Sequence, residues 1–187
     1  MNKLRFIKVR DVKTPSRSNE GDAGLDFYIP RDLDPQHLIQ MEANRTPNHF
    51  TPDFVLGVDT VTNHVTTIEI YPGGKILIPS GIKLLMEPRE SMLMAANKSG
   101  LASKKGLLYT AEIVDSPYVG EIHIGIINLS RTIQTLKSGE KATQLFMYQF
   151  ILLNQKKFKK EIFILNLKCG EFGKIKDLAH QEINHGR

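Results

Sequence analysis

The feature that most limits the fold is the division of the chain into short stretches of β-forming residues. Gly and Pro residues lie in the intervals between these stretches. They cover residues 4–9, 25–29, 55–70, 75–78, 82–86, 91–96, 121–129 and 142–153. Helical periodicity is almost absent, apart from a short helix predicted over 36–42. Many short strands with this punctuation predict an all-β barrel or sandwich.

Two of these stretches carry more detailed predictions. In 25–29 the apolar residues alternate with polar ones, so we expect Asp26 to point away from the core. In 75–86 the sequence Pro79-Ser80-Gly81 separates two apolar runs, which predicts two strands with a break between them.

The size and composition of the chain favour a single domain over residues 1–187. The chain has 187 residues, 41% of them hydrophobic, which is enough to bury a core. Residues 31–73 contain several prolines and no catalytic pattern, and we interpret them as an arm inserted at the surface. Within this arm a hairpin is predicted over 55–70, with Thr66, Ile68 and Ile70 on one face.

Charge and cysteine content limit the partners and the compartment. The formal charge of +5 suits a polyphosphate ligand, although it does not single one out, and we do not expect nucleic acid as a partner. The single cysteine, Cys169, excludes an internal disulfide and indicates a reducing compartment. No apolar run reaches the roughly 20 residues of a membrane helix, so we expect a cytoplasmic protein without membrane contact.

A short polar turn offers a place for an anion. Lys98, Ser99 and Gly100 supply a cation, a hydroxyl and an unhindered backbone amide in consecutive positions, which together can surround a phosphate oxygen. The same tripeptide is also common in solvated surface turns.

A single acid follows an apolar pair further along the chain. Asp115 stands after Ile113 and Val114 and before Ser-Pro, where we expect a rigid strand hairpin to hold its carboxylate. A general base needs such a fixed position. An Asp before Ser-Pro is also a frequent turn initiator, so the two readings stay open at this point.

Four stretches together resemble the motifs of the trimeric deoxyuridine triphosphatase (dUTP pyrophosphatase) family, in the same order. They are Ala23-Gly24-Leu25-Asp26, Lys98-Ser99-Gly100-Leu101-Ala102, Ile113-Val114-Asp115 with Tyr118 and Gly120-Glu121, and Gly139-Glu140-Lys141-Ala142-Thr143-Gln144-Leu145. Ile78-Pro79-Ser80-Gly81 also fits the strand before the second motif. The resemblance covers about residues 1–30 and 75–153.

The resemblance implies a jelly-roll-like β-fold, a homotrimer with active sites between subunits, and hydrolysis of a deoxynucleoside triphosphate, dUTP first, to the monophosphate and pyrophosphate. It implies that Asp115 activates the attacking water and that Tyr118 lies against the deoxyribose. It implies a Mg²⁺ ion held mainly by the triphosphate, with Asp26 acting on it through water. The phosphate-binding residues that it implies are Lys98, Ser99, Gly100 and Gln144.

Three positions depart from the family pattern. Lys98 stands where the family usually has arginine, and Glu112 stands where a glycine usually reads the uracil edge, next to Ile113. The fifth motif is reduced to a remnant around Phe172, which could stack on a base, within a divergent C-terminal extension over 154–187.

Two alternatives to a dUTP pyrophosphatase stay open on the sequence. One is an enzyme acting on another deoxypyrimidine triphosphate, or a relative of dCTP deaminase, although the glutamate of that enzyme would fall at Gly125. The other is a nucleotide-binding or partner-binding module that has lost turnover.

Overall fold

The computed structural model describes residues 3–45, 52–87, 90–110 and 112–149. Residues 1–150 form one compact unit, and a second unit, residues 151–187, lies outside the described residues. The predictions for Phe172 and for the C-terminal extension therefore fall outside the described part of the chain.

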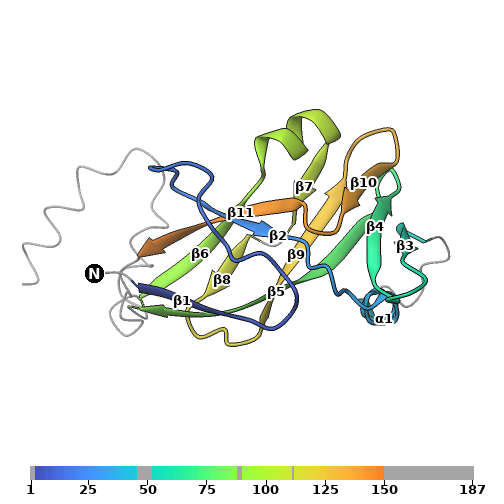
Figure 1. The fold of residues 1–187 in the computed structure, drawn as a ribbon. Helices are drawn as coiled ribbons and strands as arrows, with labels where there is room; N and C mark the ends of the chain where they lie inside the picture. The colour runs from blue at the N-terminus through green and yellow to red at the C-terminus, as the bar shows by residue number, and fades with distance from the viewer. Residues whose placement is uncertain (1–2, 46–51, 88–89, 111, 150–187) are drawn as a thin grey trace, which may run out of the picture. The chain divides into compact units, whose positions relative to one another are not determined.

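The described residues are built almost entirely from antiparallel strands (Figure 1). The elements are β1 (Lys3–Lys8), β2 (Leu25–Tyr28), α1 (Pro35–Arg45), β3 (Phe54–Val58), β4 (Val65–Ile70), β5 (Lys75–Glu87), β6 (Ser91–Ala96), the one-turn helix η1 (Leu101–Lys105), β7 (Leu107–Tyr109), β8 (Ile113–Asp115), β9 (Glu121–Asn128), β10 (Gln134–Lys137) and β11 (Lys141–Gln149). None of the helices in the described ranges is long and apolar enough to cross a membrane.

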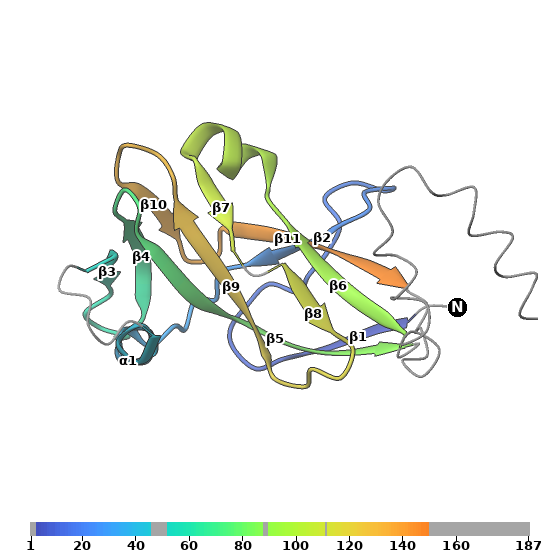
Figure 2. The ribbon, with the colours of Figure 1, turned by 180° about the vertical axis from the view of Figure 1, so that it is seen from behind.

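The strands form three sheets, in the orders β1-β5-β9-β7, β2-β11-β6-β8 and β10-β4-β3. Figures 1 and 2 show β2 and β11 running across β5 and β9, with the three-stranded sheet at one end of these layers. Alternate side chains of both four-stranded sheets belong to one buried core, which includes Phe27, Ile78, Leu93, Ile124 and Leu145. The prediction of an all-β, jelly-roll-like fold is thereby confirmed.

The break predicted in 75–86 is wrong, because β5 runs without interruption from Lys75 to Glu87. Gly81 has a φ of +74°, a value that side-chain-bearing residues rarely adopt, and here the strand bends. Before the bend β5 pairs with β9, and after it β5 pairs mainly with β1. The Pro-Ser-Gly sequence thus marks a bend within one strand, which the sequence pattern cannot distinguish from a chain break.

The segment 31–73 is more deeply integrated than a surface arm. Asp34 caps α1 by accepting a hydrogen bond from the Gln36 amide at 2.9 Å, and Pro35 occupies the first helical position. The predicted hairpin is present as β3 and β4, and β4 also pairs with β10. Buried residues of the segment join the common core, among them Leu33, Leu38, Val65, Ile68 and Ile70.

One detail of that hairpin differs from the prediction. Thr66 is exposed while Val65 is buried, because the strand register shifts between Gly57 and Val58. The shift moves the alternation by one residue at this end of β4, so Thr66 does not share the face of Ile68. That 31–73 is an insertion relative to the family stays a prediction.

The bend in β5 can be tested with a pair of glycine substitutions. At Gly81 an added Cβ would lie 2.8 Å from Val12 Cγ1, whereas at Gly73, with a φ of +77°, it would meet nothing within 4 Å. We expect Gly73→Ala to cost about 1 kcal/mol from backbone strain alone, and Gly81→Ala about 2 to 4 kcal/mol because overlap is added. Urea unfolding at one protein concentration measures both, and equal losses would contradict the packing assigned to Gly81.

Candidate functional site

The turn that follows β6 is fixed from both sides. The Asn97 side-chain oxygen accepts a hydrogen bond from the Tyr109 amide at 2.5 Å, and the Ala102 amide donates to the Lys98 carbonyl at 2.9 Å. Ser99 and Gly100 are exposed at the start of η1, and a Cβ at Gly100 would meet nothing within 4 Å. The Ser99 hydroxyl and the Gly100 backbone, which were predicted to bind an anion, are therefore accessible from outside.

Asp26 is buried, which corrects the prediction that it points away from the core. Its residue exposure is only 3%. The Ser18 hydroxyl donates to it at 2.6 Å, the Lys141 ammonium lies at 2.8 Å, and Lys98 forms a further ion pair with it. Alternation did put Asp26 opposite Phe27, but the 16–18 loop and two lysines cover that side of the sheet as well.

The environment of Asp26 keeps its carboxylate charged. Burial raises the pKa of this group, but hydrogen bonds from Lys141, Lys98 and Ser18 outweigh burial and lower the pKa from 3.8 to about 2. In turn, the hydrogen bond to Asp26 raises the pKa of Lys141. One carboxylate thus holds two ammonium groups, which leaves the group with an excess of positive charge.

Gln144 lies next to this group on β11. It is the register partner of Asp26 on β2 and of Ala96 on β6, and its side-chain amide donates to the Asn97 carbonyl at 3.4 Å. We name Asp26, Lys98, Ser99, Gly100 and Gln144 the phosphate-side group. The structure brings these five predicted residues to one end of one sheet.

Two members of this site, Ser18 and Lys141, were not predicted from the sequence. Ser18 stands in a polar loop without a distinctive pattern, so no sequence signal marked it. Lys141 lies within the fourth motif, three residues before Gln144, and that odd spacing on a strand gave no indication of a shared face. A register shift between Lys141 and Thr143 explains how Lys141 reaches the Asp26 carboxylate although Gln144 is the register partner of Asp26.

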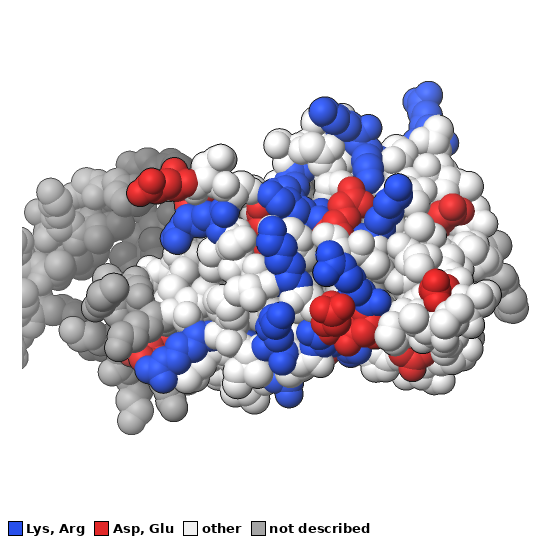
Figure 3. All heavy atoms as spheres, in the orientation of Figure 1, with Lys and Arg blue, Asp and Glu red and all other residues white. Residues whose placement is uncertain are grey.

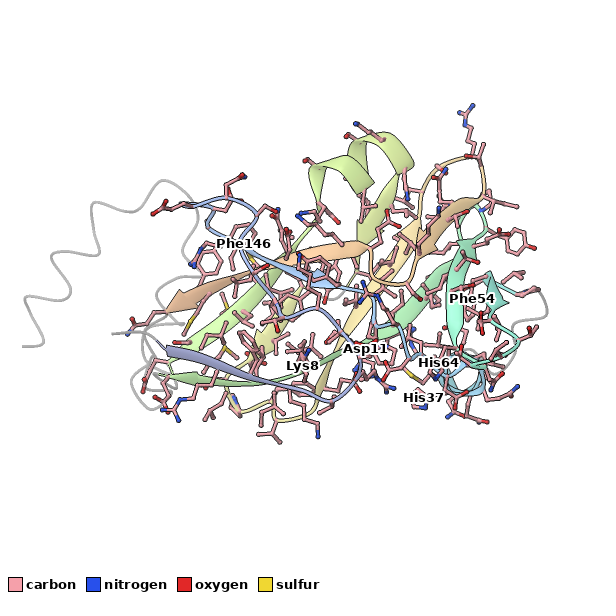
Figure 4. The ribbon with its side chains drawn as sticks, viewed as in Figure 1. Lys8, Asp11, His37, Phe54, His64 and Phe146 are labelled. Atoms are coloured by element: carbon pink, nitrogen blue, oxygen red, sulfur yellow. The ribbon has the colours of Figure 1, made fainter. Side chains whose placement is uncertain are left out.

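The glycine of the first motif has a packing role. A Cβ at Gly24 would lie 3.1 Å from the ring of Phe146 on β11, whose position Figure 4 shows. Close approach of this ring to the backbone fixes the entry into β2 and therefore the position of Asp26.

Asp115 belongs to a different part of the same sheet. It ends β8, which pairs with β6 and not with β9, so the predicted strand hairpin is wrong. The turn after Asp115 closes with a hydrogen bond from the Tyr118 amide to the Asp115 carbonyl at 3.0 Å, and the chain then crosses to the other four-stranded sheet. The acid is nevertheless held at a defined strand end, with its side chain exposed.

A hollow of about 200 Å³ lies beside Asp115. Its lining residues are Tyr109, Ile113, Val114, Asp115, Tyr118, Ile122 and His123. Burial raises the pKa of Tyr109 to about 12, so its hydroxyl remains a donor, to the His123 carbonyl at 3.2 Å. Burial also lowers the pKa of His123 and outweighs the nearby Glu121, which raises it. The lowered pKa favours a neutral imidazole at pH 7.

Ile113 lines this hollow, and Glu112 directly precedes it in the chain. Ile113 is 58% exposed, and Glu112 is exposed while its carbonyl accepts a hydrogen bond from the Ala95 amide at 2.7 Å. The backbone at this position is therefore bound to β6, and the Glu112 carboxylate extends from anchored backbone just before β8.

The phosphate-side group and the hollow do not converge within one chain. In the strand register, Asp115 lies opposite Met92 and Gln144 lies opposite Ala96. These two partner positions on β6 are four residues apart. At about 3.3 Å per residue along β6, and with β6 standing between β8 and β11, their Cα atoms are separated by about 16 Å.

The described residues offer no ready-made metal cage. No group of three or more His, Cys, Asp or Glu side chains in this part of the chain could hold a metal ion. Both oxygens of Asp26 already accept hydrogen bonds from Ser18 and the two lysines. The residues present therefore fit an ion that arrives with its own ligands better than one bound by the chain alone.

Figure 3 shows the face of the molecule that is turned to the viewer in Figure 1. Lys and Arg side chains gather across its middle, with fewer acidic side chains among them. Such a surface raises the local concentration of anions.

The charge of Asp26 predicts a pH-dependent contribution to stability. Because its folded pKa of about 2 lies below its unfolded value, the contribution is complete above about pH 4 and is lost as the pH falls toward 2. We expect Asp26→Asn to lower the free energy of unfolding by about 2 kcal/mol at pH 7, and this deficit to shrink below pH 4. Urea unfolding from pH 7 down to the lowest pH at which the protein stays folded measures it, with the exposed Glu20→Gln as control. A deficit that is independent of pH would contradict the assignment.

Known proteins similar to this chain belong to one family. The family model described as dUTPase matches residues 56–166. The deoxyuridine 5'-triphosphate nucleotidohydrolase of Caldanaerobacter subterraneus subsp. tengcongensis is 36% identical over 97 residues, which are 51% of this chain and 65% of that protein. The matched part thus spans slightly less than two thirds of that relative. The protein of the same name from Chlamydia trachomatis serovar D is 27% identical over 138 residues, which are 73% of this chain and 94% of the relative.

Solved structures show the same fold. The dUTPase from phage phi11 of S. aureus superposes with a TM-score of 0.57 at 16% identity, covering 81% of this chain and 93% of the phage chain. The dUTPase from Streptococcus mutans gives 0.52 at 20% identity, covering 80% and 98%. With a family match over more than half of its length and the motif residues in place on a jelly-roll-like fold, the chain belongs to the dUTPase family.

Proposed function

We propose that this protein hydrolyses dUTP to dUMP and pyrophosphate. The observation that carries the proposal is the exposed carboxylate of Asp115 at the rim of a hollow that Tyr118 and Ile113 line. A nucleoside fits such a partly apolar hollow, and an acid at its edge can reach a water molecule beside the first phosphate. The names of the relatives in the comparison support dUTP as the substrate.

In the proposed reaction Asp115 accepts a proton from water as the water oxygen attacks the α-phosphorus. The new bond joins the water oxygen to this phosphorus, and the bond to the bridging oxygen of the β-phosphate breaks, so that pyrophosphate leaves. No covalent enzyme intermediate is needed. The Tyr118 ring would pack against the deoxyribose and leave no room for a 2′-hydroxyl, while Glu112 and Ile113 would lie next to the base.

The phosphate-side group would neutralise the charge of the triphosphate. Ser99 and Gly100 offer their hydroxyl and amide from an exposed turn, and Gln144 lies on the adjacent strand. Lys98 and Lys141 share one carboxylate, so a phosphate can draw on the positive charge that Asp26 leaves uncompensated. Lys98 offers a point charge where arginine would offer a planar fork, so it restricts the phosphate geometry less.

Mg²⁺ is proposed as the cofactor, bound mainly by phosphate oxygens with Asp26 in contact through water. When bound, it would withdraw charge from the phosphates and hold them in one conformation. One similar structure, of a point mutant of the phage phi11 enzyme, is described as showing a structural Mg(II) ion.

We further propose a homotrimer in which one copy supplies the phosphate-side group and another supplies the hollow. The separation of about 16 Å between Gln144 and Asp115 within one chain supports this arrangement, because a single α-phosphate cannot contact both. Exposure of Ile113, Tyr118 and Val119 around the hollow also favours a covering surface.

The deaminase alternative finds no support at Gly125. A Cβ there would lie 2.4 Å from the Thr110 hydroxyl oxygen, and the Thr110 amide donates to the Gly125 carbonyl at 2.9 Å. A glutamate at this position would therefore require the Thr110 side chain to turn away from β9. The binding-module alternative makes a different prediction, namely nucleotide binding without turnover.

The substrate can be tested by pyrophosphate release from dUTP, dCTP, dTTP and UTP, each with Mg²⁺ and with chelator. We expect metal-dependent turnover of dUTP well above that of the other three. Turnover of dCTP in preference to dUTP would assign Glu112 to an amino group on the base. Binding of dUTP without any turnover would contradict the enzyme proposal and favour the binding module.

The role of Asp115 can be tested by Asp115→Asn, which keeps the size of the side chain but removes its basicity. We expect kcat for dUTP to fall by about 10²- to 10⁴-fold with dUTP binding retained, as is usual for loss of a general base. The exposed Glu69→Gln on β4 serves as the matched control and should leave kcat unchanged. An Asp115→Asn enzyme of normal rate would exclude Asp115 as the base.

A further inference from the structure

An ion pair joins the N-terminal part of the chain to Glu121, which directly precedes the hollow residues Ile122 and His123. Arg10, in the loop after β1, donates from Nε and Nη2 to the two carboxylate oxygens of Glu121 at 2.8 and 3.1 Å. The side chains are 21% and 15% exposed, so this two-pronged pair is largely sheltered from water. A pair of this geometry holds its carboxylate in one orientation far better than an exposed lysine contact does.

The loop that carries Arg10 is itself fixed. Lys8 donates to the Val12 carbonyl at 3.0 Å, and the Asp11 amide donates to Asp32 at 2.8 Å. Figure 4 labels Lys8, at the end of β1, and Asp11, in the loop that follows it. Arg10 therefore reaches Glu121 from an anchored backbone.

Glu121 joins this loop to the bend of β5. Its Oε1 atom also accepts a hydrogen bond from the Gly81 amide at 2.7 Å, while the Gly81 carbonyl accepts one from the Val9 amide at 2.8 Å. Three segments that are distant in sequence thus meet at one carboxylate at the start of β9.

The backbone of Glu121 fixes the ring of Tyr118. The Tyr118 hydroxyl donates to the Glu121 carbonyl at 2.7 Å. The ring lies directly over Gly120, where an added Cβ would be 2.6 Å from the hydroxyl oxygen and 2.7 Å from Cζ. The position of the ring over the hollow therefore depends on the backbone at 120–121, which the Arg10 pair holds in place.

We infer that Arg10 is a positioning residue for sugar selection, acting through Glu121 on the ring of Tyr118. The inference rests on the proposed function, in which this ring excludes a ribose 2′-hydroxyl. Without Arg10, the largely buried Glu121 carboxylate loses its cation and turns toward water, and the ring gains freedom to move away from the hollow. Selectivity between deoxyribose and ribose would then fall, while the acid Asp115 stays in place on β8.

The test compares Arg10→Gln with Arg10→Lys in the full-length protein. For each, kcat and KM are measured with dUTP and with UTP. We expect Arg10→Gln to reduce the ratio of kcat/KM for dUTP over UTP by about tenfold, with kcat for dUTP little changed. Arg10→Lys, which keeps the charge but not the fork, should give an intermediate ratio.

Arg5→Gln is the matched control, because Arg5 forms an exposed ion pair with Glu87 at 3.3 Å between the neighbouring strands β1 and β5. It should leave the ratio unchanged. The inference is overturned if folded Arg10→Gln keeps the wild-type ratio of kcat/KM for dUTP over UTP, even if its melting temperature falls. If Arg10→Gln does not fold, the same outcome in Arg10→Lys overturns it. A merely structural role would lower stability without altering the ratio.

Binding separates failure of this inference from failure of the proposed function. If the wild-type protein lacks turnover, the affinities for the α,β-imido analogues of dUTP and UTP replace kcat/KM, and the same loss of preference is expected in Arg10→Gln. A wild-type protein that neither hydrolyses nor binds these nucleotides would overturn the proposed function and this inference together.

Discussion

The site depends first on a buried carboxylate that two lysines share. Asp26 could not be buried alone, since an unpaired charge in the interior costs several kcal/mol, and the lysines from the β6 turn and from β11 offset that cost. The consequence is mutual. The acid orders the turn that carries Ser99, and the lysines keep the acid ionised, so β2, β6 and β11 are held together at the end where an anion would bind.

The fold could be predicted from the sequence because its strands obey simple rules. Period-two alternation and Gly or Pro punctuation identified most strands, and a short helix was predicted over 36–42, inside the observed α1. The connections were less accessible. A glycine at positive φ lets β5 bend and continue, so Pro79-Ser80-Gly81 looked like a break, and the residues after Asp115 cross between sheets where the sequence suggested a hairpin. Both errors concern which strand pairs with which, and this depends on contacts that are distant in sequence.

The site was predictable to a similar degree. Motif order found Asp26, Lys98, Gln144, Asp115 and Tyr118, and the structure places them in two groups. Alternation failed for Asp26, because a strand can be covered on both faces by a loop and by long lysine side chains. Ser18, Lys141 and Arg10 could not be identified, since each acts on a partner that only the folded chain brings near. Roles in the site therefore extend beyond the residues that carry a recognisable pattern.

Strand β6 pairs with both strands that carry the proposed site residues, β8 with Asp115 and β11 with Gln144. Asp115 is registered opposite Met92 on one side of this strand, and Gln144 is registered opposite Ala96 on the other. The offset between Asp115 and Gln144 within one chain is therefore counted in peptide units of a single strand. A slip of one residue in either pairing would change it by about 3.3 Å and turn the side chains to the opposite face. In an assembly of identical copies, the same error would be repeated in every site at once, so the accuracy of all sites depends on the register of one six-residue strand.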